Sequence, residues 1–180
     1  MLLALDISTT CCGIAVFDEK HKLQELSHIK FSKDKTLFEK LDEFIEHLQK
    51  YKEITFTEIS IEEPLLRFAG RFSNANTIQK LTQMNAMIST YLFLTTKIQP
   101  VYYNVLHARK TAFPDLLIPR DHPHKKYLIW EMVYKLEPVI NWEYSKTGKL
   151  KDENFDMCDA YVVGLAHIVT AIKSKVPVSE

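Results

Sequence analysis

The sequence predicts an α/β fold in which a mixed five-stranded sheet carries helices on both faces. Three short apolar segments separated by only a few residues come first, which is typical of an antiparallel meander. Two further apolar segments then alternate with helical periodicities, which indicates strand–helix–strand crossovers and parallel pairing. No internal repeat, low-complexity tract or linker divides the 180 residues, so we expect a single domain over residues 1–180.

The meander is predicted from the first 31 residues. Residues 1–5 form a continuous apolar run that ends at Asp6, as expected of a central strand buried on both faces. Residues 13–17 and 22–31 are the second and third expected strands, joined by a tight polar connection.

A helix and a fourth strand are expected next. Apolar residues recur at helical spacing over residues 37–48, with Ser32 or Asp34 as the expected N-cap. Residues 54–62 show the pattern of a strand, and Pro64 ends it.

The second half of the sequence is expected to be mainly helical. The expected elements are a long helix over 77–97, a fifth strand over 101–105, a short helix over 108–113, an amphipathic helix over 125–136 and a last helix over 155–173. Residues 142–153 are polar and are expected to form a mobile loop. The most apolar stretch, 160–172, is too short to span a bilayer, so no membrane partner is expected.

Composition excludes several classes of site. The four glycines, at positions 13, 70, 148 and 164, cannot form GxGxxG or GxxxxGK[ST], which excludes classical Rossmann and P-loop nucleotide sites. Three cysteines without a CxxC pair, together with the absence of HExxH, argue against a structural zinc site. With no secretory leader at the start, this cysteine usage predicts a reducing, cytoplasmic-type compartment.

The charge is balanced overall but unevenly distributed. Residues 1–63 carry 8 Lys and Arg against 13 Asp and Glu, whereas residues 64–135 carry 10 against 3. A basic middle segment is compatible with a surface that binds a polyanion beside a carboxylate-rich site. An unevenly charged solvated surface explains the same counts.

Four carboxylates at the ends of apolar elements are candidate metal ligands. Asp6 ends the first strand and Glu62 ends the fourth. Asp156 and Asp159 are spaced i and i+3, so they share one face of the last helix. A carboxylate at a buried strand end costs solvation free energy unless a positive charge compensates it. Magnesium, which prefers hard oxygen ligands, would supply that charge.

Each acid also has a structural explanation of its own. Asp6 would suit a turn, and Glu62 an ion pair with Arg67. Asp156 would suit the positive end of a helix dipole. Asp159 is the hardest to explain in this way, because its neighbours are apolar. Taken together, the four acids favour a metal site.

Four segments resemble, in order, the motifs of RuvC-type Holliday junction resolvases. Residues 3–16 resemble their first hairpin, in which an Asp ends strand one and a Gly seven residues later opens strand two. Residues 60–63, Ser-Ile-Glu-Glu, resemble the fourth-strand motif with its catalytic Glu, and residues 74–81 resemble the segment after it. Residues 156–167 resemble the final helix, with the pattern D-x-x-D-A followed by apolar residues and a His.

The resemblance implies a ribonuclease-H-like fold and a metal-dependent endonuclease that cleaves Holliday junctions or other branched DNA. The family's metal-binding carboxylates correspond to Asp6, Glu62, Asp156 and Asp159. The implied reaction is phosphodiester hydrolysis with two Mg²⁺ ions, one generating hydroxide and one stabilising the leaving oxygen. Mn²⁺ would accept the same oxygen ligands. Asp6, which lies centrally, is the expected bridging ligand.

Two positions depart from the family pattern. Ser8 stands where the family usually has Gly, and Glu63 stands where many members have Gln, which leaves open which of Glu62 and Glu63 is the ligand. The resemblance also implies a cytoplasmic enzyme of a bacterium or a phage-infected cell, or an enzyme of an organelle.

The residues expected to contact DNA come mainly from the basic middle segment. They are Arg67, Arg71, Lys80, Arg109, Lys110, Lys125 and Lys126. Lys125 or Lys126 is also expected to assist the reaction near the metals, as a basic residue does in the family. The family places an apolar wedge after the catalytic Glu, which would be Phe68 here, with Phe72 as the alternative. Solvated surface positions would explain several of the basic residues equally well. A position in the core would explain Phe68 equally well.

Symmetrical cuts across a junction require two active sites, so the resemblance implies a homodimer. The expected helix over 77–97, with Met84, Met87 and Tyr91, is a candidate interface, although a buried core face would explain the same residues.

Two other functions stay open at this point. A catalytically inactive module that binds branched DNA would keep the fold without turnover, although the four retained acids count against it. An actin-like or sugar-kinase-like phosphate-binding protein would share the first hairpin. Such kinases need two domains of this type, and 180 residues hold one.

Overall fold

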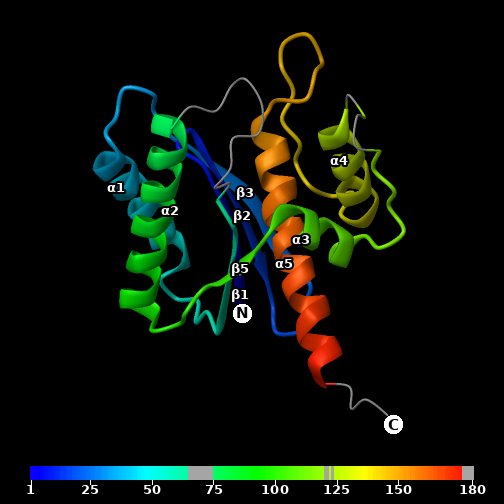
Figure 1. Cartoon of the computed structure of the whole chain (residues 1–180), viewed down its shortest axis with the longest axis horizontal. Coiled ribbons are helices and arrows are strands. Elements are labelled where there is room, and N and C mark those ends of the chain that lie inside the picture. The colour runs from blue at the N-terminus through cyan, green and yellow to red at the C-terminus, as the bar shows by residue number, and fades with distance from the viewer. Residues whose placement is uncertain (65–74, 120–121, 123, 176–180) are drawn as a thin grey trace.

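The computed structural model describes residues 1–64, 75–119, 122 and 124–175. Its centre is a five-stranded sheet with the strand order β3-β2-β1-β4-β5 (Figure 1). The strands are β1 (Leu2–Ile7), β2 (Cys11–Phe17), β3 (Leu23–Lys30), β4 (Glu58–Glu62) and β5 (Val101–Tyr103). The pairs β1–β2 and β2–β3 are antiparallel, whereas β1–β4 and β4–β5 are parallel. The predicted mixed sheet is therefore confirmed.

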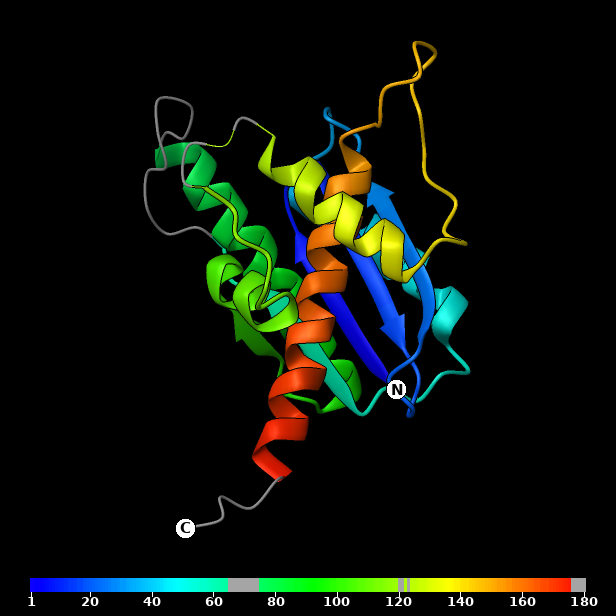
Figure 2. The same ribbon diagram turned by 90° about the vertical axis from the view of Figure 1, so that its right-hand side faces the viewer.

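Helices cover both faces of this sheet, as Figures 1 and 2 show. One layer consists of α1 (Leu37–Leu48) and α2 (Ala75–Thr96), and the other of α3 (Val105–Ala112), α4 (Lys125–Leu136) and α5 (Glu153–Lys175). Phe44 of α1 and Ile88 of α2 pack with one face of β1. Ala108 of α3 and Val133 of α4 belong to the core on the other face, which α5 fills.

The alternation of side chains along the strands decides which residues face α5. Leu3 and Leu5 of β1 pack in the core beneath α1 and α2, whereas Leu2 and Ala4 pack in the core beneath α5. Because side chains alternate between the two faces, Asp6 lies on the α5 side of the sheet. The same alternation in β4, in which Ile59 and Ile61 face α1 and α2, places Glu62 on the α5 side.

Several predicted boundaries are corrected by the structure. The N-cap of α1 is Thr36 rather than Ser32 or Asp34, because Thr36 and Glu39 form a reciprocal capping box. The fourth strand begins at Glu58, after a short 3₁₀ turn over Gln49–Tyr51 that the sequence pattern did not predict. The short helix α3 begins at Val105 because Asn104 caps it by accepting a hydrogen bond from the Leu106 N–H (3.1 Å).

The prediction that Met84, Met87 and Tyr91 of α2 form a dimer interface is partly wrong. Met84 is 0% exposed and packs against the sheet with Ile88, so its side chain belongs to the core. Met87 and Tyr91 are half-buried, and Tyr91 packs against the same core. The homodimer itself stays a prediction.

The segment over residues 142–153, which was expected to form a loop, contains a short hairpin. The Trp142 side chain is buried, with 7% of its surface exposed. An antiparallel bridge between Tyr144 and Leu150 closes a hairpin that leads into α5. Polar composition alone favoured a loop, whereas the hydrogen bonds described below join the two strands of the hairpin and the start of α5.

The central helix α5 is longer than its apolar stretch indicated. Within the described part of the chain, α5 alone is long and apolar enough to cross a membrane by length and composition. Its most apolar window is 67% buried inside the molecule, as in the core helix of a globular domain.

Candidate metal centre and its surroundings

Three of the four predicted acids converge at one end of the sheet. Carboxylate oxygens of Asp6, Glu62 and Asp159 all lie within 4.8 Å of one another. Asp6 and Glu62 come from the carboxyl ends of the adjacent parallel strands β1 and β4, which meet at the same edge of the sheet. Asp159 comes from the second turn of α5, which packs over this face. Asp6 and Glu62, which are 56 positions apart, and Asp159, which follows Glu62 by 97 positions, therefore form one acidic cluster.

A glycine in β2 allows α5 to approach the sheet closely enough for this convergence. Gly13 pairs with Asp6 in the β1–β2 ladder. A Cβ atom built on Gly13 would lie 2.0 Å from the backbone oxygen of Asp156. Any larger residue at position 13 would therefore push the first turns of α5, including Asp159, away from Asp6.

Asp156 lies beside the cluster rather than within it. Its charge helps raise the pKa of both Asp6 and Glu62, so it is close to both of them. Burial raises the pKa of Asp156 itself, and a hydrogen bond from the Cys11 thiol opposes that shift. Cys11 was not predicted as a neighbour of the site, although its spacing from Gly13 places both residues on the α5 side of β2.

Burial and mutual repulsion make the cluster unfavourable when all its acids are ionised. Burial, followed by the charge of Glu62, raises the pKa of Asp6 well above its usual range. Burial, followed by the charge of Asp159, raises the pKa of Glu62 to about 8. A divalent cation would compensate these charges, and carboxylate oxygens are the ligands that Mg²⁺ and Mn²⁺ prefer. The residues present therefore fit a hard divalent metal.

Two cations partly neutralise the cluster. The Arg109 guanidinium donates a hydrogen bond from Nη2 to Oδ1 of Asp159 (2.7 Å). The charge of Arg109, and after it that of Lys126, lowers the pKa of Glu62 against the effect of burial. Arg109 was predicted to contact phosphate, and its direct contact with a candidate metal ligand could not be found from the sequence.

The other residues that were predicted to contact DNA are spread over several parts of the molecule. Lys110 and Lys125 line a cavity of about 640 Å³, together with Arg109 and apolar residues that include Phe113. Lys80 is exposed on α2, in the opposite helical layer. Four of the predicted residues lie outside the described part of the chain: Arg67, Phe68, Arg71 and Phe72.

The two departures from the family pattern are explained locally. Glu63 is exposed and belongs to no acidic cluster among the described residues, which identifies Glu62 as the candidate ligand. Ser8 closes the β1–β2 connection, because its hydroxyl donates to the Cys11 carbonyl (2.8 Å) and accepts from the Cys11 N–H (3.0 Å). Serine thus stabilises a turn that presents Asp6.

We expect the metal-free protein to lose stability as the pH rises from about 5 to about 8. Glu62 keeps its proton in the folded state up to a pKa of about 8, whereas the unfolded chain releases it near 4.5, so deprotonation favours unfolding in this window. The thermal midpoint in EDTA should therefore fall by several degrees over this range, since 1 kcal/mol shifts the midpoint by about 2–4 °C in a chain of this size. Mg²⁺ should raise the midpoint at pH 8 far more than at pH 5.

A Glu62→Gln variant is the control for this stability prediction. It removes the titrating carboxyl and should flatten the pH profile in EDTA. A midpoint that rises steadily from pH 5 to pH 8 without metal would contradict the assignment of Glu62 to a repulsive cluster.

No protein-family model and no curated protein matches this sequence. Solved structures do match it. RuvC from Thermus thermophilus in complex with Holliday junction substrate has a TM-score of 0.68 at 12% identity, covering 96% of this chain and 94% of that one. The yeast mitochondrial Holliday junction resolvase Ydc2 has a TM-score of 0.62 at 11% identity, covering 97% of this chain and 80% of its own.

A third similar structure is that of the fowlpox virus resolvase with its substrate Holliday junction DNA. Its TM-score is 0.51 at 10% identity, covering 94% of this chain and 99% of that one. The chain therefore has the ribonuclease-H-like fold of these resolvases, and the resemblance predicted from sequence motifs is confirmed at the level of the fold.

Proposed function

We propose that this chain is a metal-dependent endonuclease that cleaves Holliday junctions or related branched DNA. The observation that carries the proposal is the convergence of Asp6, Glu62 and Asp159 at the carboxyl ends of two adjacent parallel strands. Structural similarity to three junction resolvases over nearly the whole chain supports the same substrate class.

In this proposal Asp6, Glu62 and Asp159 hold the divalent ions, and Asp156 extends the set for a second ion. When bound, the ions activate a water molecule as the nucleophile and stabilise charge on the leaving oxygen. Asp6 would be the central residue of this set, because the charges of Glu62, Asp159 and Asp156 all act on its carboxyl group.

Basic residues of the chain would position the DNA at the cluster. Lys126, whose charge acts on Asp6, Glu62 and Asp156, would hold the phosphate that is attacked. Arg109 restrains the Asp159 carboxylate, and Lys110 and Lys125 extend the positive charge away from the cluster. Each such contact with a phosphate would make binding sensitive to salt.

The assembly and the compartment are part of the same proposal. A homodimer would supply the two active sites that symmetrical cuts on a junction require. Buried free cysteines Cys11, Cys12 and Cys158 fit a reducing, cytoplasmic-type compartment.

Incubation with labelled four-way junction, flap and linear duplex DNA, each with Mg²⁺, Mn²⁺ or EDTA, tests the proposal. We expect metal-dependent nicking of the branched substrates and little cleavage of the linear duplex. Tight junction binding without nicking would indicate an inactive DNA-binding module, and ATP hydrolysis with a sugar would indicate a kinase-like protein. Either result would refute the proposal that the chain is a nuclease.

A further inference from the structure

We propose that the hairpin formed by residues 143–151 binds the phosphate backbone of a DNA arm beside the carboxylate cluster. This inference rests on the proposed function and adds a contact surface to it. The hairpin leads directly into α5, so its second strand ends at Lys151, five positions before Asp156. Figures 1 and 2 show it projecting beyond the end of α5 that carries the acids.

Backbone hydrogen bonds close the hairpin around a tight turn. The Ser145 N–H donates to the Lys149 carbonyl (2.7 Å), and the Lys151 N–H donates to the Glu143 carbonyl (3.1 Å). At the turn, the Gly148 N–H donates to the Ser145 carbonyl (3.0 Å), and Gly148 has a φ of +77°. An isolated two-stranded hairpin is marginally stable in water, so its conformation must be supported from its base.

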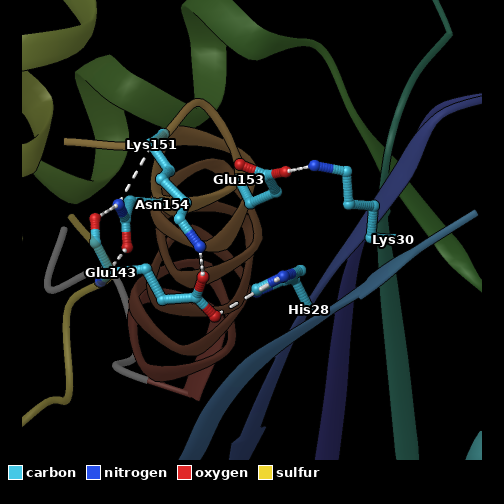
Figure 3. Close-up of polar contacts among 6 residues, drawn as sticks. All are labelled: His28, Lys30, Glu143, Lys151, Glu153 and Asn154. Atoms are coloured by element: carbon cyan, nitrogen blue, oxygen red, sulfur yellow. Dashed lines mark hydrogen bonds and ion pairs between the residues drawn. The ribbon is translucent and has the colours of Figure 1, made fainter. Parts of the chain in front are cut away.

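A buried asparagine provides this support. Asn154 is 0% exposed, and its side chain binds both strands of the hairpin (Figure 3). Its Oδ1 accepts from the Glu143 N–H (3.0 Å), while its Nδ2 donates to the carbonyls of Glu143 (2.6 Å) and Lys151 (3.0 Å). The side-chain amide therefore joins the base of the hairpin to the first turn of α5.

Contacts between polar side chains lie at the same base and between the start of α5 and the sheet. The Glu143 carboxylate accepts a hydrogen bond from Lys151 (2.7 Å), which lowers the pKa of Glu143, and lies 3.9 Å from His28 of β3. Glu153, at the start of α5, pairs with Lys30 of β3 (Figure 3). The base of the hairpin thus contacts both β3 and the start of α5.

The tip of the hairpin presents positive charge to solvent. Residues 144–151 contain three lysines and no acidic residue, and Lys151 is held by Glu143. Lys146 and Lys149 are exposed, and no described residue forms an ion pair with either of them. Thr147 and Gly148 between them are also exposed, so the tip buries no apolar surface. The supported hairpin therefore presents two cations that form no ion pair within the described part of the chain.

The dimensions suit a duplex arm. Glu143 and Lys146 are three residues apart, which corresponds to about 10 Å along a strand at about 3.3 Å per residue. Base pairs in a duplex are about 3.4 Å apart, so this length corresponds to about three base pairs.

Replacing both lysines in a Lys146→Ala/Lys149→Ala variant tests the inference. Binding to a fluorescently labelled four-way junction is measured in EDTA, which prevents cleavage, between 50 and 300 mM salt. We expect the dissociation constant to rise about tenfold at 100 mM salt. The slope of log affinity against log salt should become less steep by about 1.8, because each lost phosphate contact removes about 0.9.

Two lysines at the other end of the sheet offer a matched control. Lys20 and Lys22 are exposed in the turn between β2 and β3, so Lys20→Ala/Lys22→Ala removes the same charge from a hairpin turn remote from the acids. This variant should keep the parent's dissociation constant and salt slope. A Lys146→Arg/Lys149→Arg variant should restore both values, because arginine keeps the charge.

The outcomes separate this inference from the proposed function. If the parent nicks junctions with metal but Lys146→Ala/Lys149→Ala binds them with the parent's affinity and salt slope, the hairpin assignment is wrong and the nuclease stands. A fall in the thermal midpoint together with the loss of affinity would make the lysines structural and would also overturn the assignment. A parent that neither binds nor nicks branched DNA would refute both.

Discussion

Replacing Asp6 with asparagine is expected to abolish junction cleavage and to leave junction binding intact. The amide removes one negative charge and one ligand oxygen from a cluster whose oxygens lie within 4.8 Å of one another. Metal ions contribute several kcal/mol of transition-state stabilisation, so losing about 4 kcal/mol would slow cleavage by about 10³-fold. Binding should be as tight as in the parent or tighter, because a negative charge facing a phosphate is removed.

Thermal stability distinguishes this result from misfolding. Burial and the neighbouring acids raise the pKa of Asp6 well above its usual range, so the ionised carboxylate is unfavourable without a cation. The Asp6→Asn variant should therefore unfold at a higher temperature than the parent in EDTA at pH 8, and it should gain less from added Mg²⁺. Single-turnover cleavage, anisotropy with labelled junction and thermal melting together measure the three effects.

Glu63→Gln is the matched control for charge. Glu63 is exposed and adjoins Glu62, so its replacement removes one acid near the site without removing a ligand. It should cleave at close to the parent's rate. Junction cleavage by Asp6→Asn at the rate of Glu63→Gln would show that the acidic cluster is not the catalytic centre.

Much of the fold and part of the site could be predicted from local patterns. The apolar run before Asp6 identified a buried central strand, and the strand pattern over residues 54–62 placed Glu62 at the end of the fourth strand. Both acids were recognisable because a charged residue ends a strand that is otherwise buried. The i and i+3 spacing likewise placed Asp156 and Asp159 on one face of α5.

Contacts that depend on how distant elements pack could not be predicted in this way. The ion pair between Arg109 and Asp159 joins residues 50 positions apart and requires α3 to lie against α5. The structural role of Asn154 could not be predicted either, because its polar neighbours in sequence indicated a loop. Its burial follows from hydrogen bonds to two hairpin strands, a pattern that composition does not reveal.

Replacing Gly13 with alanine is expected to reduce cleavage by about 10²-fold or more, although position 13 carries no functional group. The added Cβ would lie 2.0 Å from the Asp156 backbone oxygen and 2.5 Å from its carbonyl carbon, both of which are backbone atoms that cannot rotate away. The start of α5 must therefore shift, and it carries Asp156 and Asp159 with it. A displacement of about 1 Å at a catalytic site can reduce the rate about 10²-fold.

Gly148→Ala separates this effect from the general cost of replacing a glycine. Nothing lies within 4 Å of a Cβ at position 148, but the φ of +77° makes alanine unfavourable there by about 1–2 kcal/mol. Gly148→Ala should therefore lower the thermal midpoint modestly and cleave normally at saturating junction concentration. Gly13→Ala should lose cleavage even well below its own midpoint, and Mg²⁺ should stabilise it less than the parent. If Gly13→Ala cleaved as fast as Gly148→Ala, the position of Asp159 would not depend on the close approach of α5 to β2.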